Sequence, residues 1–398
     1  MELSELKNKF KKKYRQSATC YTKFKGLSAY ANWILSNYEM FRKASIVRAK
    51  PLKLTIDCAN ICHLKCPLCP NGLGILDRKK GKAKYELFES LLQEVGDYVF
   101  YIDFFNWGEP LTNREVLTKW IRLANKKGII TSVSTNLGLP LSDVDAERLV
   151  VSGLSKMIVS IDGTSQKTYS TYRRGGDFDL VMKNLGNLIE IKKKLNQDKP
   201  VIIWQYLVFR FNEHEMNKAK YIAKRMGVDQ IQFVSPYIEL DAYPIPEEDR
   251  EEIATWHPKI PKYNRYLQAE RTGNALSKYV TKGTKSNCWR CDWLYMSSSI
   301  NYDGSVAPCC GLHEEKDDFG TLGLHGENAY MQIINNQKYR TARDASARRI
   351  NWSAGIVCEN CTSTELHNYA DHINRGIVFD LFCYLSEKIL KNLKFRPA

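Results

Sequence analysis

Short apolar runs alternate with amphipathic stretches along the middle of the chain. Six runs have the length and composition of buried strands, over residues 52–57, 101–105, 129–134, 157–162, 201–208 and 231–234. Four stretches between them carry apolar residues on one helical face, which predicts helices over 85–99, 114–127, 177–195 and 213–226. Strands that alternate with helices predict an α/β fold with a parallel sheet and right-handed crossovers.

The number of strand–helix units limits the architecture. Six units are too few for a full eight-stranded barrel, so a partial (β/α)6 TIM-like barrel and an open doubly wound sheet both fit. In either fold, ligands bind at the carboxyl ends of the strands. We therefore expect functional residues directly after the predicted strands.

The flanking sequence differs from this core and predicts additional parts. Residues 1–50 have helical spacing without strand-like alternation, and residues 366–398 contain an amphipathic stretch over 376–393. Residues 241–285 begin rich in proline and charge, as connecting segments are, and residues 301–306 give a strand–turn signal within a cysteine-bearing module. The predicted parts are an N-terminal helical extension (1–50), a partial barrel (51–240), a connecting segment (241–285), a small module with a β-hairpin (286–365) and a C-terminal helix (366–398).

Charge and hydropathy indicate the cellular compartment and the kind of binding partner. No apolar run in the 398 residues approaches the length of a membrane span, and the charged N-terminus lacks a secretory signal, so we expect a cytoplasmic protein. The net charge of +15 favours an anionic partner, namely a phosphorylated substrate, a nucleic acid or an anionic membrane surface. Basic residues concentrate in 7–15 and 388–396, so peripheral membrane contact is one hypothesis, and solvated faces or helices packed on the barrel are the alternative.

Twelve cysteines in a reducing compartment indicate metal ligation or redox chemistry more than disulfides. Cys62, Cys66 and Cys69 follow the first predicted strand with three and then two intervening residues. Three thiolates satisfy three irons of a [4Fe-4S] cubane and leave the fourth iron open to another ligand. A zinc site completed by Cys58 or His63 is the alternative.

The segment IDCANICHLKCPLCPNG, which holds these cysteines, resembles the cluster loop of the radical S-adenosylmethionine (SAM) superfamily. The resemblance implies that the open iron binds the amino and carboxylate groups of SAM. It also implies reductive cleavage of SAM to a 5′-deoxyadenosyl radical, with electrons from a donor such as flavodoxin or ferredoxin. Leu68 departs from the family, which often has an aromatic residue beside the adenine at this position.

Other strand ends resemble the SAM-binding positions of the same family. Asn-Trp-Gly-Glu-Pro at 106–110 resembles its Gly-Gly-Glu-Pro turn, and Tyr-Arg-Arg-Gly-Gly at 172–176 resembles its Tyr-Arg-x-Gly-Gly segment. The resemblance implies that Glu109 accepts from the SAM ammonium and that Arg173, or else Arg174, pairs with the SAM carboxylate. Residues at the ends of the third and fourth strands complete the expected cofactor site, namely Asn136 and Ser160.

The late cysteines supply enough thiols for a second cubane without an open iron. Their layout resembles the twitch module, a shortened form of the SPASM domain, and implies one auxiliary [4Fe-4S] cluster. Cys288 is an alternative to the first ligand, and a zinc ribbon is the alternative for the whole module. The expected ligands are Cys291, Cys309, Cys358 and Cys361.

Together these motifs predict an oxidoreductase that abstracts hydrogen from a polar substrate, small molecule or peptide, and oxidises it through the auxiliary cluster. Cys310, next to an expected ligand, is the candidate residue facing the substrate; a buried spare thiol is the alternative. Peptide maturation is a second chemistry, although residues 1–50 are short for a peptide-recognition domain. A zinc-stapled nucleic-acid-binding protein is the alternative from another class, and we do not expect nucleic acid as the partner.

Overall fold

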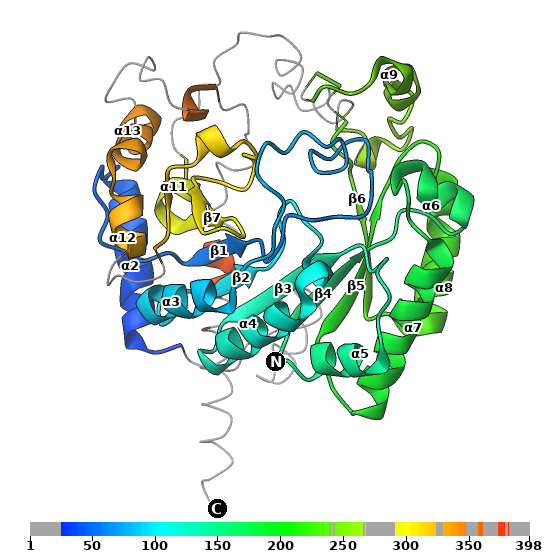
Figure 1. The fold of residues 1–398 in the computed structure, drawn as a ribbon, viewed down its shortest axis with the longest axis horizontal. Helices are drawn as coiled ribbons and strands as arrows, with labels where there is room; N and C mark the ends of the chain where they lie inside the picture. The colour runs from blue at the N-terminus through cyan, green and yellow to red at the C-terminus, as the bar shows by residue number, and fades with distance from the viewer. Residues whose placement is uncertain are drawn as a thin grey trace, which may run out of the picture.

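A sheet of nine strands organises the molecule (Figure 1). The computed structural model describes residues 25–238, 240–241, 243–265, 267, 291–323, 329–347, 357–360, 373–378 and 381. The sheet order is β6-β5-β4-β3-β2-β1-β7-β8-β9, and each neighbouring pair from β6 to β1 is parallel. All six strands predicted from the sequence are present, as β1 (Lys53–Ile56), β2 (Tyr101–Asp103), β3 (Ile130–Thr135), β4 (Lys156–Ser160), β5 (Val201–Leu207) and β6 (Gln230–Val234).

Helices follow these strands, as in a partial TIM-like barrel, and confirm the predicted α/β fold. The four predicted helices are present as α3 (Tyr85–Val95), α4 (Arg114–Lys126), α7 (Phe178–Lys194) and α8 (Met216–Met226). Two shorter helices, α5 (Asp143–Val150) and α6 (Gln166–Tyr172), were not predicted. Both begin at a serine whose hydroxyl accepts from a backbone N–H three residues later, a capping signal that needs no long apolar period.

The cysteine-bearing module continues the same sheet. Strand β7 (Ser297–Ile300) pairs in parallel with β1 and antiparallel with β8 (Ser305–Ala307), which confirms the predicted hairpin. Gly304 has a φ of 88° in the hairpin turn, where a side chain would be strained. The module also contains β9 (Gly320–Thr321), α11 (Trp293–Met296), α12 (Ala329–Ile334) and α13 (Gln337–Ser346). The hairpin therefore extends the barrel sheet at its β1 edge.

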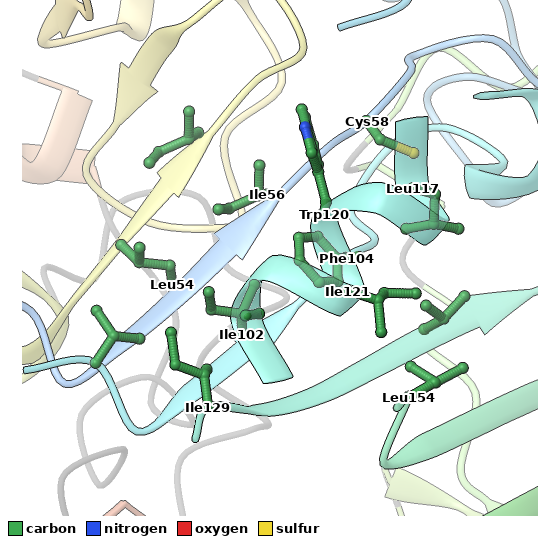
Figure 2. Close-up of a cluster of buried hydrophobic side chains, with 14 of the residues drawn as sticks. Leu54, Ile56, Cys58, Ile102, Phe104, Leu117, Trp120, Ile121, Ile129 and Leu154 are labelled. Atoms are coloured by element: carbon green, nitrogen blue, oxygen red, sulfur yellow. The ribbon is translucent and has the colours of Figure 1, made fainter. Parts of the chain in front are cut away.

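The hydrophobic core lies between one face of the sheet and its helices (Figure 2). Leu54 of β1, Ile102 of β2 and Trp120 of α4 belong to this core, and all three side chains are fully buried. The Trp120 ring also packs against Phe88 of α3, with ring centroids 4.9 Å apart. Because side chains alternate along a strand, the residues between these apolar positions face the inside of the barrel.

That inner face is polar at several levels. The strand register places Thr55 between Asp103 and Ser299, and Asp103 beside Ser132. Farther along, it places Gln205 between Ser160 and Gln232. A parallel sheet that is covered only by hydrophobic packing has apolar residues on both faces, so this polarity indicates a surface that meets a polar ligand.

Residues 238–256 form a second hydrophobic cluster against the loop that holds Cys66. The segment contains α9 (Glu247–Ala254), which the pattern of proline and charge did not predict. Trp256 packs edge-on against Phe209, with ring centroids 5.6 Å apart, and both side chains are buried. The cluster joins two buried side chains of the cysteine loop, Leu64 and Cys66, to the buried side chains that cover them, namely Tyr172, Phe209, Ile238, Ile245, Ile253 and Trp256.

Helix α2 (Leu27–Phe41) lies beside the module and confirms helical structure within the predicted N-terminal extension. Residues 373–378 are helical, and Asn374 accepts a hydrogen bond of 2.7 Å from the Trp33 indole of α2. Residues 1–24 and most of the predicted C-terminal helix lie outside the described residues. Over the part of the chain that the structure describes, no helix has the length and apolar content needed to cross a membrane.

Candidate functional site

The three early cysteines share the loop between β1 and α3, at the carboxyl end of the sheet. Cys66 is buried, and Cys62 and Cys69 are half-buried. The loop folds tightly, because a Cβ on Gly72 would lie 2.3 Å from the carbonyl oxygen of Cys66. Only glycine permits this approach without moving the backbone.

The pKa values of these thiols affect which metals they can bind. Burial raises the pKa of Cys62 to about 11 and that of Cys66 to about 12, while the positive charge of Arg173 opposes the shift for both. Such thiols are protonated at neutral pH and become thiolates when a cation binds them. The soft, all-sulfur donor set therefore fits an iron–sulfur cluster or zinc.

Among the described residues, no three His, Cys, Asp or Glu side chains converge to hold one metal ion. A cubane makes a different demand, because each thiolate bonds its own iron. The three cysteines of this loop meet that demand in number and in donor type. The assignment of these cysteines as cluster ligands remains a prediction.

Glu109 follows β2 and is buried against the end of β3. Its Oε1 accepts from the Thr135 hydroxyl at 2.6 Å and from the Leu111 N–H at 3.0 Å, and its Oε2 accepts from the Asn136 N–H at 2.8 Å. Burial raises the pKa of Glu109, and these hydrogen bonds act in the opposite direction. The carboxylate is thus fixed in orientation at the carboxyl ends of two neighbouring strands.

The turn that carries Glu109 is held by Asp57 at the end of β1. The two carboxylate oxygens of Asp57 accept from the Trp107 N–H at 3.2 and 3.0 Å, and the side chain is buried. Gly108 passes so close to the cysteine loop that a Cβ there would lie 1.8 Å from the Ala59 carbonyl oxygen. The cysteine loop and the Glu109 turn are therefore built as one unit.

Arg173 lies close enough to the cysteine loop to shift the pKa values of its thiols, and Arg174 pairs elsewhere. The Arg173 Nε donates to Asp162 Oδ2 at 2.6 Å; the Asp162 side chain is fully buried and that of Arg173 is 14% exposed. Both terminal nitrogens of Arg174 donate to Asp249 of α9, at 2.6 and 2.8 Å. Arg173 therefore acts on the pKa values of both Cys62 and Cys66, whereas Arg174, whose pKa the charge of Cys66 also raises, ties its loop to α9.

Tyr169 of α6 belongs to the same group and was not identified from the sequence. Its hydroxyl is buried without a hydrogen-bond partner among the described residues. The charges of Arg173, Asp162, Cys66 and Glu109 all act on the pKa of this hydroxyl, so it lies among them. A buried hydroxyl without a partner is costly, and a bound polar group such as SAM would satisfy it.

The remaining expected cofactor residues border the loop. The Asn136 amide donates to the Cys62 sulfur at 3.7 Å, and Ser160 is buried at the end of β4. Leu68 packs, half-buried, against the second hydrophobic cluster. The predicted contact of Leu68 with the adenine of SAM remains a prediction.

Three of the four expected auxiliary ligands are described. The Cys291 N–H donates to the Ser346 hydroxyl of α13 at 2.8 Å, and the charges of Cys358 and Cys309 both raise the pKa of Tyr339 on the same helix. Chain segments far apart in sequence thus meet around α13. Cys361 and its alternative, Cys288, lie outside the described residues.

Cys310 is adjacent to a charged group on the inner face of the sheet. Burial raises the pKa of Cys310, and the charges of Lys53 and Asp103 act on the thiol. Lys53 Nζ and Asp103 Oδ2 form an ion pair at 2.6 Å, each side chain about one-fifth exposed, and the Ser132 hydroxyl donates to the other carboxylate oxygen. The sequence alone did not single out this group, because lone polar residues inside strands carry no motif.

Two protein-family models match the chain, one over the barrel and one over the cysteine-bearing module. The model of the radical SAM superfamily matches residues 56–218, and that of the SPASM iron–sulfur cluster-binding domain matches residues 288–362. The fold and the cysteine loop thus define a radical SAM enzyme. More specifically, the chain belongs to the radical SAM superfamily and carries a C-terminal SPASM iron–sulfur domain.

Similar proteins of known identity cover most of the chain. It is 22% identical to GTP 3′,8-cyclase of Clostridium botulinum over 307 residues, which covers 72% of this chain and 89% of that protein. It is 26% identical to GTP 3′,8-cyclase of Alkaliphilus oremlandii over 291 residues, covering 69% and 85%. Among solved structures, Streptococcus suis SuiB bound to its precursor peptide SuiA has the same fold, with 16% identity, a TM-score of 0.54 and coverage of 85% and 79%.

Proposed function

We propose that this radical SAM enzyme dehydrogenates a hydroxyl-bearing polar substrate held against the inner face of the barrel. The observation that carries the proposal is the Lys53–Asp103–Ser132 group beside Cys310, on a face where a structural sheet needs no charge. The expected product is the corresponding carbonyl compound.

The cofactors and their ligands follow the sequence prediction. Cys62, Cys66 and Cys69 would hold the SAM-binding [4Fe-4S] cluster, and Glu109 with Arg173 would orient SAM. When bound, the cluster and SAM together supply the 5′-deoxyadenosyl radical that takes a hydrogen atom from the substrate. Burial of the loop beneath the second hydrophobic cluster excludes water, which protects a radical reaction from side reactions.

Asp103 is the proposed acceptor of the hydroxyl proton. One of its oxygens pairs with Lys53 and the other accepts from Ser132, which leaves lone pairs for a substrate hydroxyl. The conversion of H–C–O–H to C=O releases one hydrogen atom, one proton and one electron. The hydrogen atom would end in 5′-deoxyadenosine and the proton on Asp103, and the auxiliary [4Fe-4S] cluster, if held by Cys291, Cys309, Cys358 and Cys361, would supply the acceptor for the electron.

The proposed auxiliary site holds one cluster. Cys291, Cys309, Cys358 and Cys361 supply four ligands, so all four irons of a single cubane would be bound by protein. A cluster whose irons are all bound by protein could accept an electron but would not bind the substrate. The proposed dehydrogenation needs such an electron acceptor. The meeting of three of these cysteines around α13 supports a shared site.

The relatives suggest two substrate classes. The cyclases are named for GTP, a phosphorylated and hydroxylated nucleotide, and SuiB was solved with a precursor peptide. The ion pair and hydroxyls of the inner face favour a small hydroxylated substrate, and the net charge of +15 favours one with phosphate. Peptide maturation is the second candidate, supported by the fold shared with SuiB.

The test uses the anaerobically purified holoenzyme with GTP and UDP-glucose as probes. Stimulated 5′-deoxyadenosine formation and a product lacking two hydrogens support the proposal. In Asp103→Asn this stimulation should fall about 100-fold, the usual contribution of a positioned proton acceptor, while iron content and unstimulated SAM cleavage persist. Asp97→Asn, an exposed carboxylate paired with Lys127, is the matched control and should behave as wild type.

Three results would contradict the proposal. A colourless protein that contains zinc and no iron would exclude a radical SAM reaction. About eight irons per chain fit two cubanes, whereas about four would remove the auxiliary electron acceptor. Stimulation by a peptide substrate and by neither nucleotide would favour the maturase.

A further inference from the structure

Helix α2 exposes a continuous apolar stripe on its outward face. Leu27, Ile34, Tyr38 and Phe41 are 81%, 63%, 55% and 76% exposed, and their spacing of seven, four and three residues places them on one side of the helix. Ile46, just beyond the helix, is 55% exposed. Five of the ten large hydrophobic side chains found exposed among the described residues therefore fall within 20 residues.

The opposite face of α2 packs on the protein through both polar and apolar contacts. Asn32 donates to the Lys50 carbonyl at 3.0 Å and accepts from the Lys50 N–H at 2.7 Å. Ser36 donates to the Tyr295 carbonyl at 3.3 Å, and Glu39 accepts from the Ala49 N–H at 3.0 Å. Ala29 and Met40 are buried there, and the rings of Tyr30 and Trp33 pack, half-buried, against the core.

The outward stripe is therefore a second apolar face of α2, in addition to the one that packs inward. A helix that only covers a core turns its large apolar residues inward and its polar residues to solvent. Here large aliphatic and aromatic side chains face solvent, and the buried polar side chains are satisfied by hydrogen bonds. Packing on the barrel therefore gives no reason for the stripe.

Two exposed arginines lie at the C-terminal end of the stripe. Arg42 follows Phe41, and Arg48 lies near Ile46 with its side chain 76% exposed, although its Nε also pairs with Glu39 at 3.3 Å. In the sequence, residues 7–15, which lie outside the described part, include six lysine or arginine residues. An apolar stripe with a positive border is the chemistry that binds an anionic lipid surface.

We infer that α2 is an in-plane membrane-binding helix, whose stripe enters the headgroup region of an anionic bilayer. The occupant is a lipid surface and not a second copy of the chain, because two copies of net charge +15 bring their basic borders together and repel each other. The contact is peripheral and independent of the proposed dehydrogenation. It would bring the enzyme to substrates made or used at a membrane.

The test is co-sedimentation of the full-length holoenzyme with vesicles of phosphatidylcholine and phosphatidylglycerol (7:3) and of phosphatidylcholine alone, at low and physiological salt. Binding to the anionic vesicles should exceed binding to neutral ones at least tenfold and weaken with salt. Ile34→Ser/Phe41→Ser should lose at least tenfold of the binding. Val144→Ser/Tyr221→Ser, two exposed apolar residues on α5 and α8, is the matched control and should retain it.

Circular dichroism and iron content check that both double variants fold. Equal binding by the stripe variant and the control, with both folded, overturns the inference. So does absence of binding to anionic vesicles at low salt. A dimer in solution that dissociates in Ile34→Ser/Phe41→Ser, without vesicle binding, assigns the stripe to a second copy and also overturns it.

Discussion

The titration of Asp57 gives a test of how the Glu109 turn is fastened. Asp57 is buried at the end of β1, and the Trp107 N–H donates to its carboxylate. Burial raises the pKa of Asp57 from 3.8 to about 7, more than the hydrogen bonds from the turn lower it. In the unfolded chain the carboxyl has its ordinary pKa. At pH values between 3.8 and about 7, the folded protein therefore binds one more proton than the unfolded chain.

The sign and size of the effect follow from proton linkage. Because the folded state binds the extra proton, the contribution of Asp57 to stability is greatest below the ordinary pKa and is lost as pH rises through about 7. The free energy of unfolding changes by about 1.4 kcal/mol per pH unit for one proton. Between about pH 5 and pH 7, rounding near the folded pKa leaves a decrease of about 2 kcal/mol.

The assay compares wild type with Asp57→Asn, which mimics the protonated carboxyl and does not titrate. Urea unfolding of the metal-free protein at several pH values gives the difference in unfolding free energy between them. Other buried carboxyls titrate equally in both proteins and cancel. We expect the variant to gain about 2 kcal/mol relative to wild type from pH 5 to pH 7. A difference that stays constant with pH would refute the reasoning, since Asp57 would then be ionised throughout.

Three further predictions concern other parts of the molecule. Gly108→Ala should lower both folded yield and bound iron, measured by expression and iron analysis, because its Cβ would meet the Ala59 carbonyl at 1.8 Å; Gly186→Ala in α7, whose Cβ would make only an ordinary contact of 3.8 Å with Met226, is the comparison for steric effect. Lys25 donates to the carbonyls of Gly96 and Lys127, and burial lowers its pKa to about 7, so wild type should gain stability from pH 7 toward pH 10 and Lys25→Met should lack this gain in urea unfolding. Cys309→Ala should lower iron from about eight to about four per chain and preserve substrate-independent SAM cleavage; unchanged iron would contradict its role as a ligand.

The fold was predictable because its signals are local and repeated. Each apolar run and each amphipathic stretch of the barrel reports on its own secondary structure, and parallel connections leave few arrangements. Helix α9 was missed because its eight residues are mostly acidic, and a single buried residue, Ile253, holds it against the second hydrophobic cluster. The parallel pairing of β7 with β1 was missed for another reason, since strand neighbours far apart in sequence leave no local pattern.

The site residues also divide into those that belong to a local sequence motif and those that do not. The cysteine loop and the Glu109 turn could be found from spacing, because their chemistry needs fixed residue types at fixed intervals. Tyr169, Asp57 and the Lys53–Asp103 pair gain their significance only from what surrounds them after folding. A charge within a strand looks like a solvent-facing position until the register shows that it points into a barrel.

The connection between α9 and the cysteine loop shows why the segment after the barrel matters for chemistry. Arg174 pairs with Asp249 through two hydrogen bonds, and its carbonyl accepts from the Lys65 N–H of the cysteine loop at 2.9 Å. The same loop is covered by Ile253 and Trp256. Polar ties at one side and apolar cover at the other fix the loop, and burial there raises the pKa values of Cys62 and Cys66. The segment therefore completes the site, although its sequence resembles a linker.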